Sequence, residues 1–270
     1  MDLIAEIGWN HMGDMDLLKR MVHAAKGAGA THAKFQTWHE SRLGPGPWDT
    51  DGRRDIYKKA ELSNEQFAQV RRICDAEGIR FMTSVFDARD VEAMAAVSDG
   101  EVKIPSPEVV NVPLLEEAAR RFKRVFLSTG ATTGDEVDAA LRILRAGNVD
   151  IVLMHCVSTY PCVDERVNLP RLDHLRAKHP VIGFSDHTPD AMSAVFAIGW
   201  GVAAIEKHFT IDNGLPGRDN KFALLPDAMA QIAEAAARFE QMSVDHGLDY
   251  QSAEEDQRIT YRGRWSAGGS

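Results

Sequence analysis

The sequence predicts a (β/α)8 barrel, because eight strand-like runs alternate with eight helix-like runs along the chain. Such alternation produces a parallel sheet with helices packed on it, and eight repeats of the unit are typical of the closed barrel. The length of 270 residues is sufficient for one such barrel. A doubly wound open sheet is the alternative architecture, although it usually contains fewer units.

The predicted strands are short apolar runs of the kind that parallel sheets bury on both faces. Each one is bounded by polar or turn-forming residues, which keeps it within the usual length of a strand. In chain order the strands are LIAEIG (3–8), HAKFQ (32–36), IRFMTS (79–84), EVKIPS (101–106), RVFLST (124–129), DIVLMHC (150–156), VIGFSD (181–186) and AAIEKHF (203–209).

Each predicted strand is followed by an amphipathic segment with helical spacing. Ser63 with Gln66 three residues later is a capping box, which marks the start of the second helix. The helices are expected at 14–28, 63–77, 88–97, 113–120, 134–146, 168–178, 189–199 and 226–243.

Two long connections interrupt the alternation, at 37–62 and 210–225. Both follow a strand, so we expect both at the end of the barrel where the strands finish, as lids or binding loops. The predicted barrel therefore occupies residues 1–243, and we expect the polar segment 244–270 to be a partly ordered tail.

Composition excludes several classes of function. The net charge of −9 and pI of about 5.6 argue against a nucleic-acid or anionic-membrane partner, although a local basic pocket can still bind an anionic substrate. Cys74, Cys156 and Cys162 form a sparse, odd set without a CxxC motif, which is typical of a reducing compartment. The start MDLIAEIG is not a signal peptide, and no apolar run approaches the about 20 residues of a membrane span. We expect a cytoplasmic protein.

Two histidines stand at the ends of the last two predicted strands, His187 in VIGFSDHT and His208 in AAIEKHFT. If these strands are neighbours in a parallel sheet, both imidazoles emerge at its carboxyl edge, where α/β folds bind ligands. Imidazole is the commonest protein ligand of divalent metals. The pair therefore predicts a metal site.

Lys34 and Lys103 each lie inside an apolar strand, where an ammonium group is costly unless an anion meets it. Hydroxyl groups at several other strand ends would complete a cradle for a phosphate and a carboxylate. A compound with both anions, beside a metal that polarises a carbonyl, fits phosphoenolpyruvate chemistry. The polar residues at the strand ends include Glu6, Gln36, Ser84, Ser106, Glu108, Ser128, Ser158, Tyr160, Ser185 and Glu206.

Seven segments in a fixed order carry a family resemblance: AEIGWNHMGD, GATHAKFQTW, KIPSPE, FLSTGATT, MHCVSTYPC, GFSDHTPD and IEKHFT. Taken singly they are weak signals, but the ordered set, with SDHT followed by EKHFT, is highly specific. Over about residues 3–228 the chain resembles the N-acetylneuraminate (sialic acid) synthase family.

The resemblance implies a condensation of phosphoenolpyruvate with an N-acetylated amino sugar, which releases phosphate and makes a 2-keto-3-deoxy sugar acid. It implies a divalent metal, manganese or magnesium, bound by His187 and His208, and a homodimer. The residues implied around phosphoenolpyruvate are Lys34, Ser84, Lys103, Ser106, Ser128, Ser158, Tyr160 and Ser185. Those implied near the sugar or a metal-bound water are Glu6, Gln36, Glu108 and Asp219.

Three features depart from the family pattern. Members usually carry a C-terminal antifreeze-like domain that reaches across the dimer and contributes an arginine to the partner's sugar site, and we expect no such domain within 244–270. The usual GPDH-like motif is GRDN here, so Arg218 and Asn220 replace a proline and a histidine. Pro107 stands where glycine is frequent. Our hypothesis is that Arg218 either replaces the missing arginine or meets an acidic or phosphorylated acceptor.

Two other functions compete with this interpretation. A metal-dependent aldolase or lyase of 2-keto-3-deoxy acids would need no phosphate cradle. A non-catalytic ligand-binding barrel would be consistent with the altered motif at Asn220. His11 and His155 either belong to the site or cap backbone groups, Asp186 either belongs to it or caps the helix that follows, and Glu206 either serves the site or pairs with a lysine. Trp9, Trp38 and Trp48 would form a lid or a subunit contact.

Overall fold

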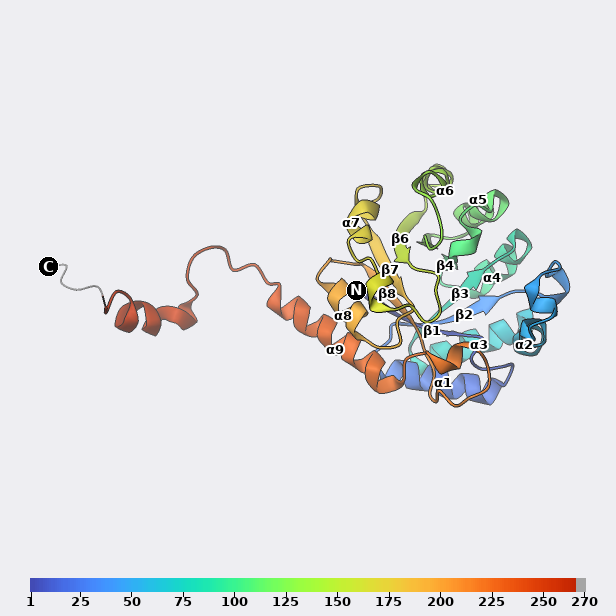
Figure 1. Cartoon of the computed structure of the whole chain (residues 1–270), viewed down its shortest axis with the longest axis horizontal. Helices are drawn as coiled ribbons and strands as arrows, with labels where there is room; N and C mark the ends of the chain where they lie inside the picture. The colour runs from blue at the N-terminus through green and yellow to red at the C-terminus, as the bar shows by residue number, and fades with distance from the viewer. Residues whose placement is uncertain (266–270) are drawn as a thin grey trace. The chain divides into compact units, whose positions relative to one another are not determined.

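Eight parallel strands form a closed barrel in the computed structural model, which describes residues 1–265 (Figure 1). Each strand pairs with the next one in the chain, and the last pairs with the first, which confirms the predicted (β/α)8 fold. The remaining residues of the predicted tail, 266–270, lie outside the described residues. The strands are β1 (Asp2–Gly8), β2 (His32–Thr37), β3 (Arg80–Val85), β4 (Glu101–Ile104), β5 (Arg124–Ser128), β6 (Asp150–Cys156), β7 (Ile182–Asp186) and β8 (Ala204–His208).

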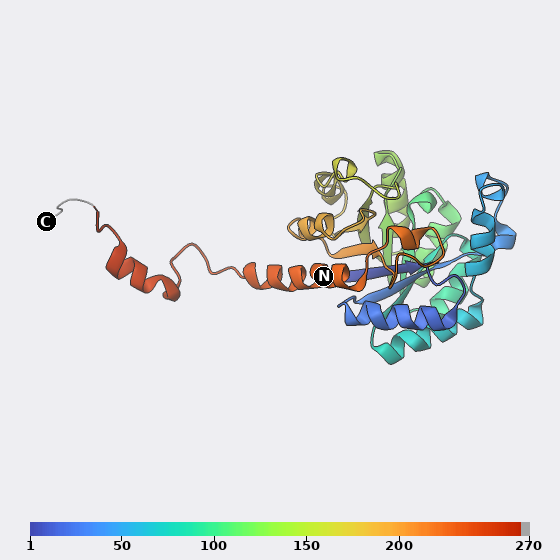
Figure 2. The same ribbon diagram turned by 60° about the horizontal axis from the view of Figure 1, so that its bottom comes forward.

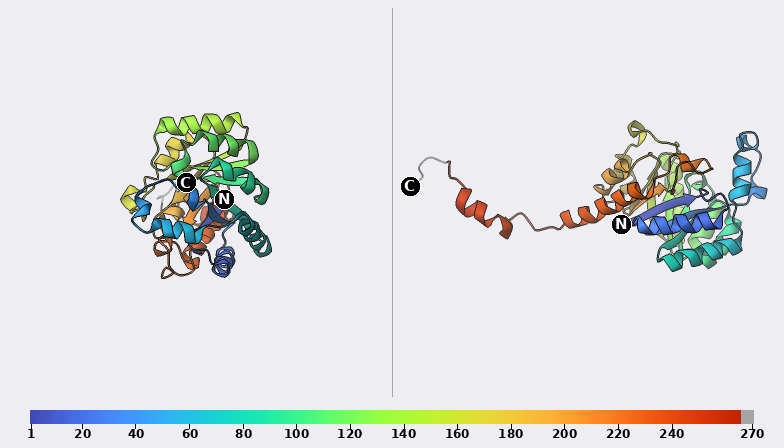
Figure 3. Two further views of the ribbon diagram at one scale, coloured as in Figure 1. Left: turned by 90° about the vertical axis from the view of Figure 1, so that its right-hand side faces the viewer. Right: turned by 90° about the horizontal axis from the view of Figure 1, so that it is seen from below.

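The helices form a ring around the strands (Figure 3). Ser63 caps its helix as predicted, with Ser63 Oγ accepting from the backbone N–H of Gln66 and the Gln66 side chain accepting from the backbone N–H of Ser63. The helices are α1 (Met15–Gly27), α2 (Arg53–Ala60), α3 (Asn64–Glu77), α4 (Val91–Val97), α5 (Val112–Arg121), α6 (Gly134–Ala146), α7 (Arg171–Arg176), α8 (Met192–Ile198) and α9 (Pro226–Met242).

Helix α2 lies inside the connection 37–62, where no helix is expected from the sequence. The segment Arg53–Ala60 is short and charged, with a single buried residue, Ala60. It therefore lacks the apolar stripe by which an amphipathic helix is recognised. In the two side views α2, in light blue, lies at the end of the barrel opposite the N-terminus (Figures 2 and 3).

The compact unit of the chain comprises Met1–Ala236, and a second unit begins at Ala237. The second unit contains a 3-10 turn at Ser252–Glu254 and a π-helical turn at Gln257–Tyr261. None of the helices within residues 1–265 combines the length and apolar character needed to cross a membrane. All three cysteines are free, so Cys156 and Cys162 form no disulfide.

Alternation along the strands divides the core into two parts. Outward residues such as Ala33, Phe35 and Leu127 pack against the helices in the main cluster. A second cluster of Ile4, Met82, Phe126, Val152, Met154 and Ala204 is separate from it and fills the barrel interior. Because successive inward side chains are two residues apart, the next inward positions are fixed, and they are polar: Glu6, Ser84, Ser128 and Glu206.

Charged residues close the opposite, N-terminal end of the barrel. His32 is fully buried there, and its Nε2 lies 2.9 Å from Glu101 Oε2. Arg124 Nη1 contacts both Asp2 (2.9 Å) and Glu101 (3.2 Å), and Arg80 also pairs with Asp2. Burial would raise the pKa of Glu101, but the His32 hydrogen bond and the two guanidinium groups lower that pKa to about 2.

The Glu101→Gln variant is expected to be less stable than the wild type at pH 7, by about 2 to 3 kcal/mol. A depressed pKa stabilises the fold above the unfolded value of 4.5, and this contribution is lost as the pH falls toward 2. The stability difference should therefore shrink below pH 4.5 in urea unfolding at pH 7, 5 and 3.5. Glu116→Gln, on the exposed face of α5, is the control. A difference that stays constant with pH would contradict the assignment.

Candidate active site

A cavity of about 580 Å³ opens at the carboxyl ends of the strands. This volume falls in the range of small-molecule sites. With one exception, all the site residues expected from the sequence line it: Glu6, Lys34, Gln36, Ser84, Lys103, Ser106, Glu108, Ser128, Tyr160, Ser185, His187, His208, Arg218 and Asp219.

Ser158 is the exception, since it does not line the cavity. Strand β6 ends at Cys156, which does line the cavity, so the two-residue alternation that would bring Ser158 inward stops before it. Ser158 lies instead beside Gly130, where an added Cβ would collide with its hydroxyl and with that of Ser106. Because Gly130 has no side chain, the backbone at this position can lie close to the hydroxyls of Ser106 and Ser158.

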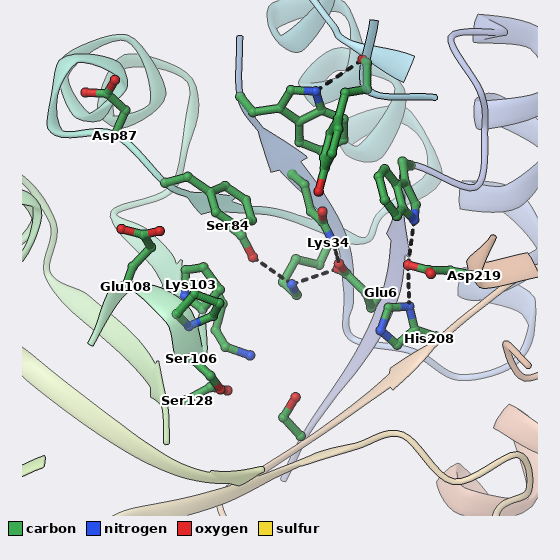
Figure 4. Close-up of a pocket in the computed structure, with 18 of the residues that line it drawn as sticks. Glu6, Lys34, Ser84, Asp87, Lys103, Ser106, Glu108, Ser128, His208 and Asp219 are labelled. Carbon is green, nitrogen blue, oxygen red and sulfur yellow. Dashed lines mark hydrogen bonds and ion pairs between the residues drawn. The ribbon is translucent and has the colours of Figure 1, made fainter. Parts of the chain in front are cut away.

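Two lysines and two glutamates form a buried ion quartet on the cavity floor. Figure 4 labels Glu6, Lys34 and Lys103 of this quartet. Lys34 Nζ lies 2.7 Å from Glu6 Oε2 and 3.6 Å from Glu206 Oε2. Lys103 Nζ lies 2.6 Å from the same Glu206 oxygen. Each of these side chains is at most 8% exposed. The charges of the quartet cancel, which is how a protein can bury four ions together.

Burial and pairing shift the pKa values of this quartet in different directions. Burial raises the pKa of Glu6. Burial also acts to raise the pKa of Glu206, but Lys103 and Lys34 together outweigh it and lower that pKa. Lys103 has a lowered pKa because its burial outweighs the attraction of Glu206. Glu206 is thus held as a carboxylate. Glu6 is the carboxyl group of the quartet that takes up a proton more readily, because its pKa is raised.

Serine hydroxyls surround the ammonium groups. Lys34 Nζ donates to Ser84 Oγ (2.8 Å), and Ser185 Oγ donates to Glu206 Oε1 (2.9 Å). Ser106 Oγ accepts from the Gly130 N–H (2.9 Å). Ser128 Oγ is buried yet has no hydrogen-bond partner among residues 1–265. Buried polar atoms are rarely left unpaired, so this hydroxyl fits an oxygen-rich ligand on the floor.

The two predicted metal ligands meet at this edge, with ring centroids 5.4 Å apart. His187 Nδ1 lies 2.8 Å from the Val157 carbonyl, which can only accept, so Nδ1 carries a proton and Nε2 of the neutral ring is the nitrogen that can bind a metal. His208 Nδ1 is buried without a hydrogen-bond partner in the described part of the chain, 3.6 Å from Asp219 Oδ2. Burial lowers the pKa of His208 well below its usual value, which keeps this imidazole neutral.

These donors fit a divalent metal with open coordination positions. Among residues 1–265 no group of three or more His, Cys, Asp or Glu side chains is arranged to hold an ion. The chain would therefore provide the imidazoles of His187 and His208 and leave the other positions to water and substrate, as catalytic metal sites do. Tyr160 and Phe222 orient these rings, with the Tyr160 ring 4.1 Å from that of His187 and the Phe222 ring 5.3 Å from that of His208.

An aromatic wall formed by Trp9, Trp38 and Tyr57 lines the cavity above the floor. Their ring centroids are 5.0 to 5.9 Å apart. The indole N–H of Trp9 donates to Asp219 Oδ2 at 2.5 Å, which holds that carboxylate beside His208. Burial raises the pKa of Asp219 to about 6. Of the three tryptophans expected in a lid or a subunit contact, Trp9 and Trp38 line the cavity and Trp48 does not.

Asn220 anchors the connection after β8. Its side chain is fully buried and bonds Thr210 Oγ1 (2.5 Å), the Asn10 carbonyl (3.1 Å) and the Pro216 carbonyl (2.7 Å). The asparagine at this position of GRDN therefore has a complete structural role. Its presence is no argument for a non-catalytic barrel.

The polar residues left open by the sequence divide between site and scaffold. His11 Nδ1 accepts from the Gly13 N–H (3.0 Å), and His155 Nε2 contacts the Val167 carbonyl (2.6 Å), so both cap backbone groups. Asp186 accepts from the Thr188 N–H and pairs with the buried Lys207 (2.9 Å) outside the cavity, behind the turn that carries His187. Glu206, in contrast, belongs to the floor.

The sequence left the role of Glu206 open, and the structure places it on the floor, paired with lysines. Lining residues that the sequence did not indicate include Arg42, Arg53 and Tyr57, from the segment around α2. The spacing of Glu206 two residues before His208 is a usable signal, since it places both on the inward face of β8. The other three stand in a long connection, where no periodicity indicates which side chains turn inward.

The fold and the cavity define a barrel of enzyme type, with its site at the carboxyl ends of the strands. Comparison with known proteins refines this class. A family model described as "NeuB family" matches residues 21–247. The chain belongs to the NeuB family.

Relatives and solved structures agree with this membership. N,N'-diacetyllegionaminic acid synthase of Legionella pneumophila is 33% identical over 86% of this chain and 70% of its own length. Pseudaminic acid synthase of Campylobacter jejuni is 31% identical over 92% of this chain and 76% of its own. The crystal structure of an N-acetylneuraminic acid (sialic acid) synthetase from Leptospira borgpetersenii has a TM-score of 0.87, with 29% identity over 98% of this chain and 92% of that chain. The chain is an enzyme whose relatives include sialic acid-type synthases.

Proposed function

We propose that this protein is a transferase that condenses phosphoenolpyruvate with the aldehyde of an open-chain sugar, such as an N-acetyl amino sugar. The products are a 2-keto-3-deoxy sugar acid, similar to a sialic acid, and inorganic phosphate. The observation that carries the proposal is the buried quartet of Lys34, Lys103, Glu6 and Glu206 beside the hydroxyls of Ser106 and Ser128. The relatives of this protein include synthases of sialic, legionaminic and pseudaminic acids.

The floor suits a small substrate with two anionic groups. Lys34 and Lys103 provide fixed positive charges in a site almost without solvent, where electrostatic stabilisation is strongest. The unpaired hydroxyl of Ser128 offers an additional donor. The ammonium groups would stabilise the phosphate and carboxylate of phosphoenolpyruvate without reorganising during the reaction.

The reaction forms one carbon–carbon bond and breaks one carbon–oxygen bond. Carbon 3 of phosphoenolpyruvate attacks the aldehyde carbon, the aldehyde oxygen takes a proton to become a hydroxyl, and positive charge develops at carbon 2. Water adds to carbon 2 and gives a proton to a carboxylate, for which Glu6 is suited by its position and its raised pKa. The carbon 2–oxygen bond to phosphate then breaks, and loss of the remaining hydroxyl proton leaves the ketone.

The other residues of the cavity would place the acceptor. Gln36 Nε2 donates to Glu6 Oε1 at 2.5 Å and so aims the carboxylate. Asp219, held by Trp9, faces His208 and can exchange a proton near neutral pH. A divalent ion, Mn²⁺ or Mg²⁺, would be held by His187 and His208 and would supply Lewis-acid polarisation of the acceptor carbonyl.

A phosphate-release assay tests this function. Phosphoenolpyruvate, Mn²⁺ and a panel of aldoses and N-acetylhexosamines should yield phosphate and a 2-keto acid in equal amounts with at least one acceptor. A metal-dependent aldolase or lyase would instead produce pyruvate from 2-keto-3-deoxy acids and no phosphate. Pyruvate without phosphate would therefore refute the condensation.

A further inference from the structure

We propose that the acceptor carries an anionic group at the end remote from its aldehyde, and that Arg218, assisted by Arg53, binds this group at the mouth of the cavity. The inference rests on the proposed function, because it concerns the second substrate of that reaction. It assigns a specificity role to two residues that contact no reacting atom.

Arg218 lies near the carboxylates of Asp51 and Asp219 but is bonded to neither of them. Its side chain is exposed and lines the cavity, and it makes no hydrogen bond or ion pair with the other described residues. The two residues that follow it, Asp219 and Asn220, are buried and bonded to Trp9, Thr210 and backbone carbonyls. The backbone that carries Arg218 is therefore anchored, which lowers the entropic cost of using its guanidinium to bind a ligand.

Arg53, the first residue of α2, brings a second guanidinium group to the same place. It pairs with Asp51, Nη2 to Oδ2, at 2.7 Å. Both arginines act electrostatically on Asp51 and on Tyr57, so both guanidinium groups lie near this part of the aromatic wall. The carboxylates of Asp51 and Asp219 lie near these two guanidinium groups, but among the described residues only Arg53 forms an ion pair there, with Asp51.

The other described lysine and arginine side chains that line the cavity each have a bonded carboxylate. Arg42 Nη1 lies 2.8 Å from Asp90 and 3.6 Å from Asp87. Lys34 and Lys103 are balanced by Glu6 and Glu206. Of the described lining cations, Arg218 is thus the one without a bonded counter-ion, and a ligand anion would supply it.

Arg218 lies at the mouth of the cavity, away from the lysines of the floor. Lys34 and Lys103 are 2% exposed, whereas Arg218 is at the surface, and the aromatic wall lines the space between. With phosphoenolpyruvate on the floor, an acceptor whose aldehyde lies near His208 would extend along the wall toward the mouth. Its far end would meet Arg218. The chemical class is an aldose or N-acyl amino sugar with a terminal phosphate or carboxylate.

Binding of unreactive acceptor analogues tests this inference separately from catalysis. The probes are the alditol of an N-acetylhexosamine, its 6-phosphate, and the corresponding alditol with a terminal carboxylate, each titrated calorimetrically into full-length protein saturated with phosphoenolpyruvate and Mn²⁺. We expect at least one anionic alditol to bind about 10-fold or more tightly than the neutral one, as expected of a charge-assisted bidentate contact. Whichever of the two anionic alditols binds more tightly shows whether the terminal group of the acceptor is a phosphate or a carboxylate.

Arg218→Ala should reduce that preference about 10-fold, and Arg53→Ala should reduce it by a smaller factor because Asp51 already engages this group. Lys221→Ala is the matched control: it removes the same charge from the same connection, but Lys221 is exposed and does not line the cavity.

Three results would overturn the inference: equal affinity for neutral and anionic alditols, no binding of either, or an unchanged preference in Arg218→Ala. Phosphate release with neutral sugars alone would then leave the condensation intact. A preference for anionic alditols without any phosphate release would refute the condensation instead.

Discussion

Lys103→Met is expected to reduce kcat/KM for phosphate release by about 10³-fold or more. The variant loses one of the two buried ammonium groups that would hold phosphoenolpyruvate, and Glu206 keeps Lys34 as its single cationic partner, at 3.6 Å. The uncompensated carboxylate then repels the anionic substrate in a site where solvent screens little. Steady-state kinetics with an acceptor found in the phosphate-release assay would measure the loss.

The double variant Lys103→Met/Glu206→Gln separates folding from function. It removes a cation and an anion together, so no unpaired charge is left by the mutation, and its free energy of unfolding should lie nearer the wild-type value than that of Lys103→Met. Its activity should remain as low as that of the single variant, because the positive charge is still absent. The surface variant Lys123→Met controls for loss of a lysine.

The same variants distinguish the synthase from the lyase. A lyase that cleaves 2-keto-3-deoxy acids needs no phosphate cradle, so it would tolerate the loss of Lys103. Full activity of a correctly folded Lys103→Met enzyme would contradict the role assigned to the quartet. Recovery of activity in the double variant would show that Glu206, and not the substrate, is the anion that Lys103 serves.

His208→Ala is expected to weaken Mn²⁺ binding by about 100-fold or more, and His187→Ala to do the same. Each substitution would remove one of the two proposed protein donors, and no third His, Cys, Asp or Glu among residues 1–265 is arranged to replace it. The electron paramagnetic resonance signal of free Mn²⁺ measures this binding without any catalytic readout. A chelator should also abolish phosphate release, and added Mn²⁺ or Mg²⁺ should restore it.

His174→Ala, on the exposed surface of α7, is the control for removal of an imidazole. Asp219→Asn tests whether the carboxylate 3.6 Å from His208 adds to the site, and a smaller loss is expected there because this carboxylate also accepts the Trp9 hydrogen bond. Unchanged Mn²⁺ affinity in both histidine variants would show that these rings are not metal ligands.

Most of the barrel is predictable because each strand and helix has its own local pattern. All eight strands lie where the apolar runs indicate, within two residues at each end, because burial on both faces demands continuous apolar residues. Helix α2 was not predictable, because its contacts with the rest of the loop depend on charged pairs such as Arg54 with Asp49. Such pairs have no periodicity in the sequence.

The amino-acid sequence was sufficient to place Lys34, Lys103, His187 and His208 at one end of one barrel, since strand polarity and two-residue alternation follow from covalent geometry. Tertiary structure alone decided how the charges there are matched: that one Glu206 oxygen serves both lysines, that Trp9 holds Asp219, and that Arg218 has no bonded counter-ion among residues 1–265. These contacts join residues as far apart as 9 and 219. Their distances depend on how the barrel closes and how its long connections pack, and no local pattern carries that information.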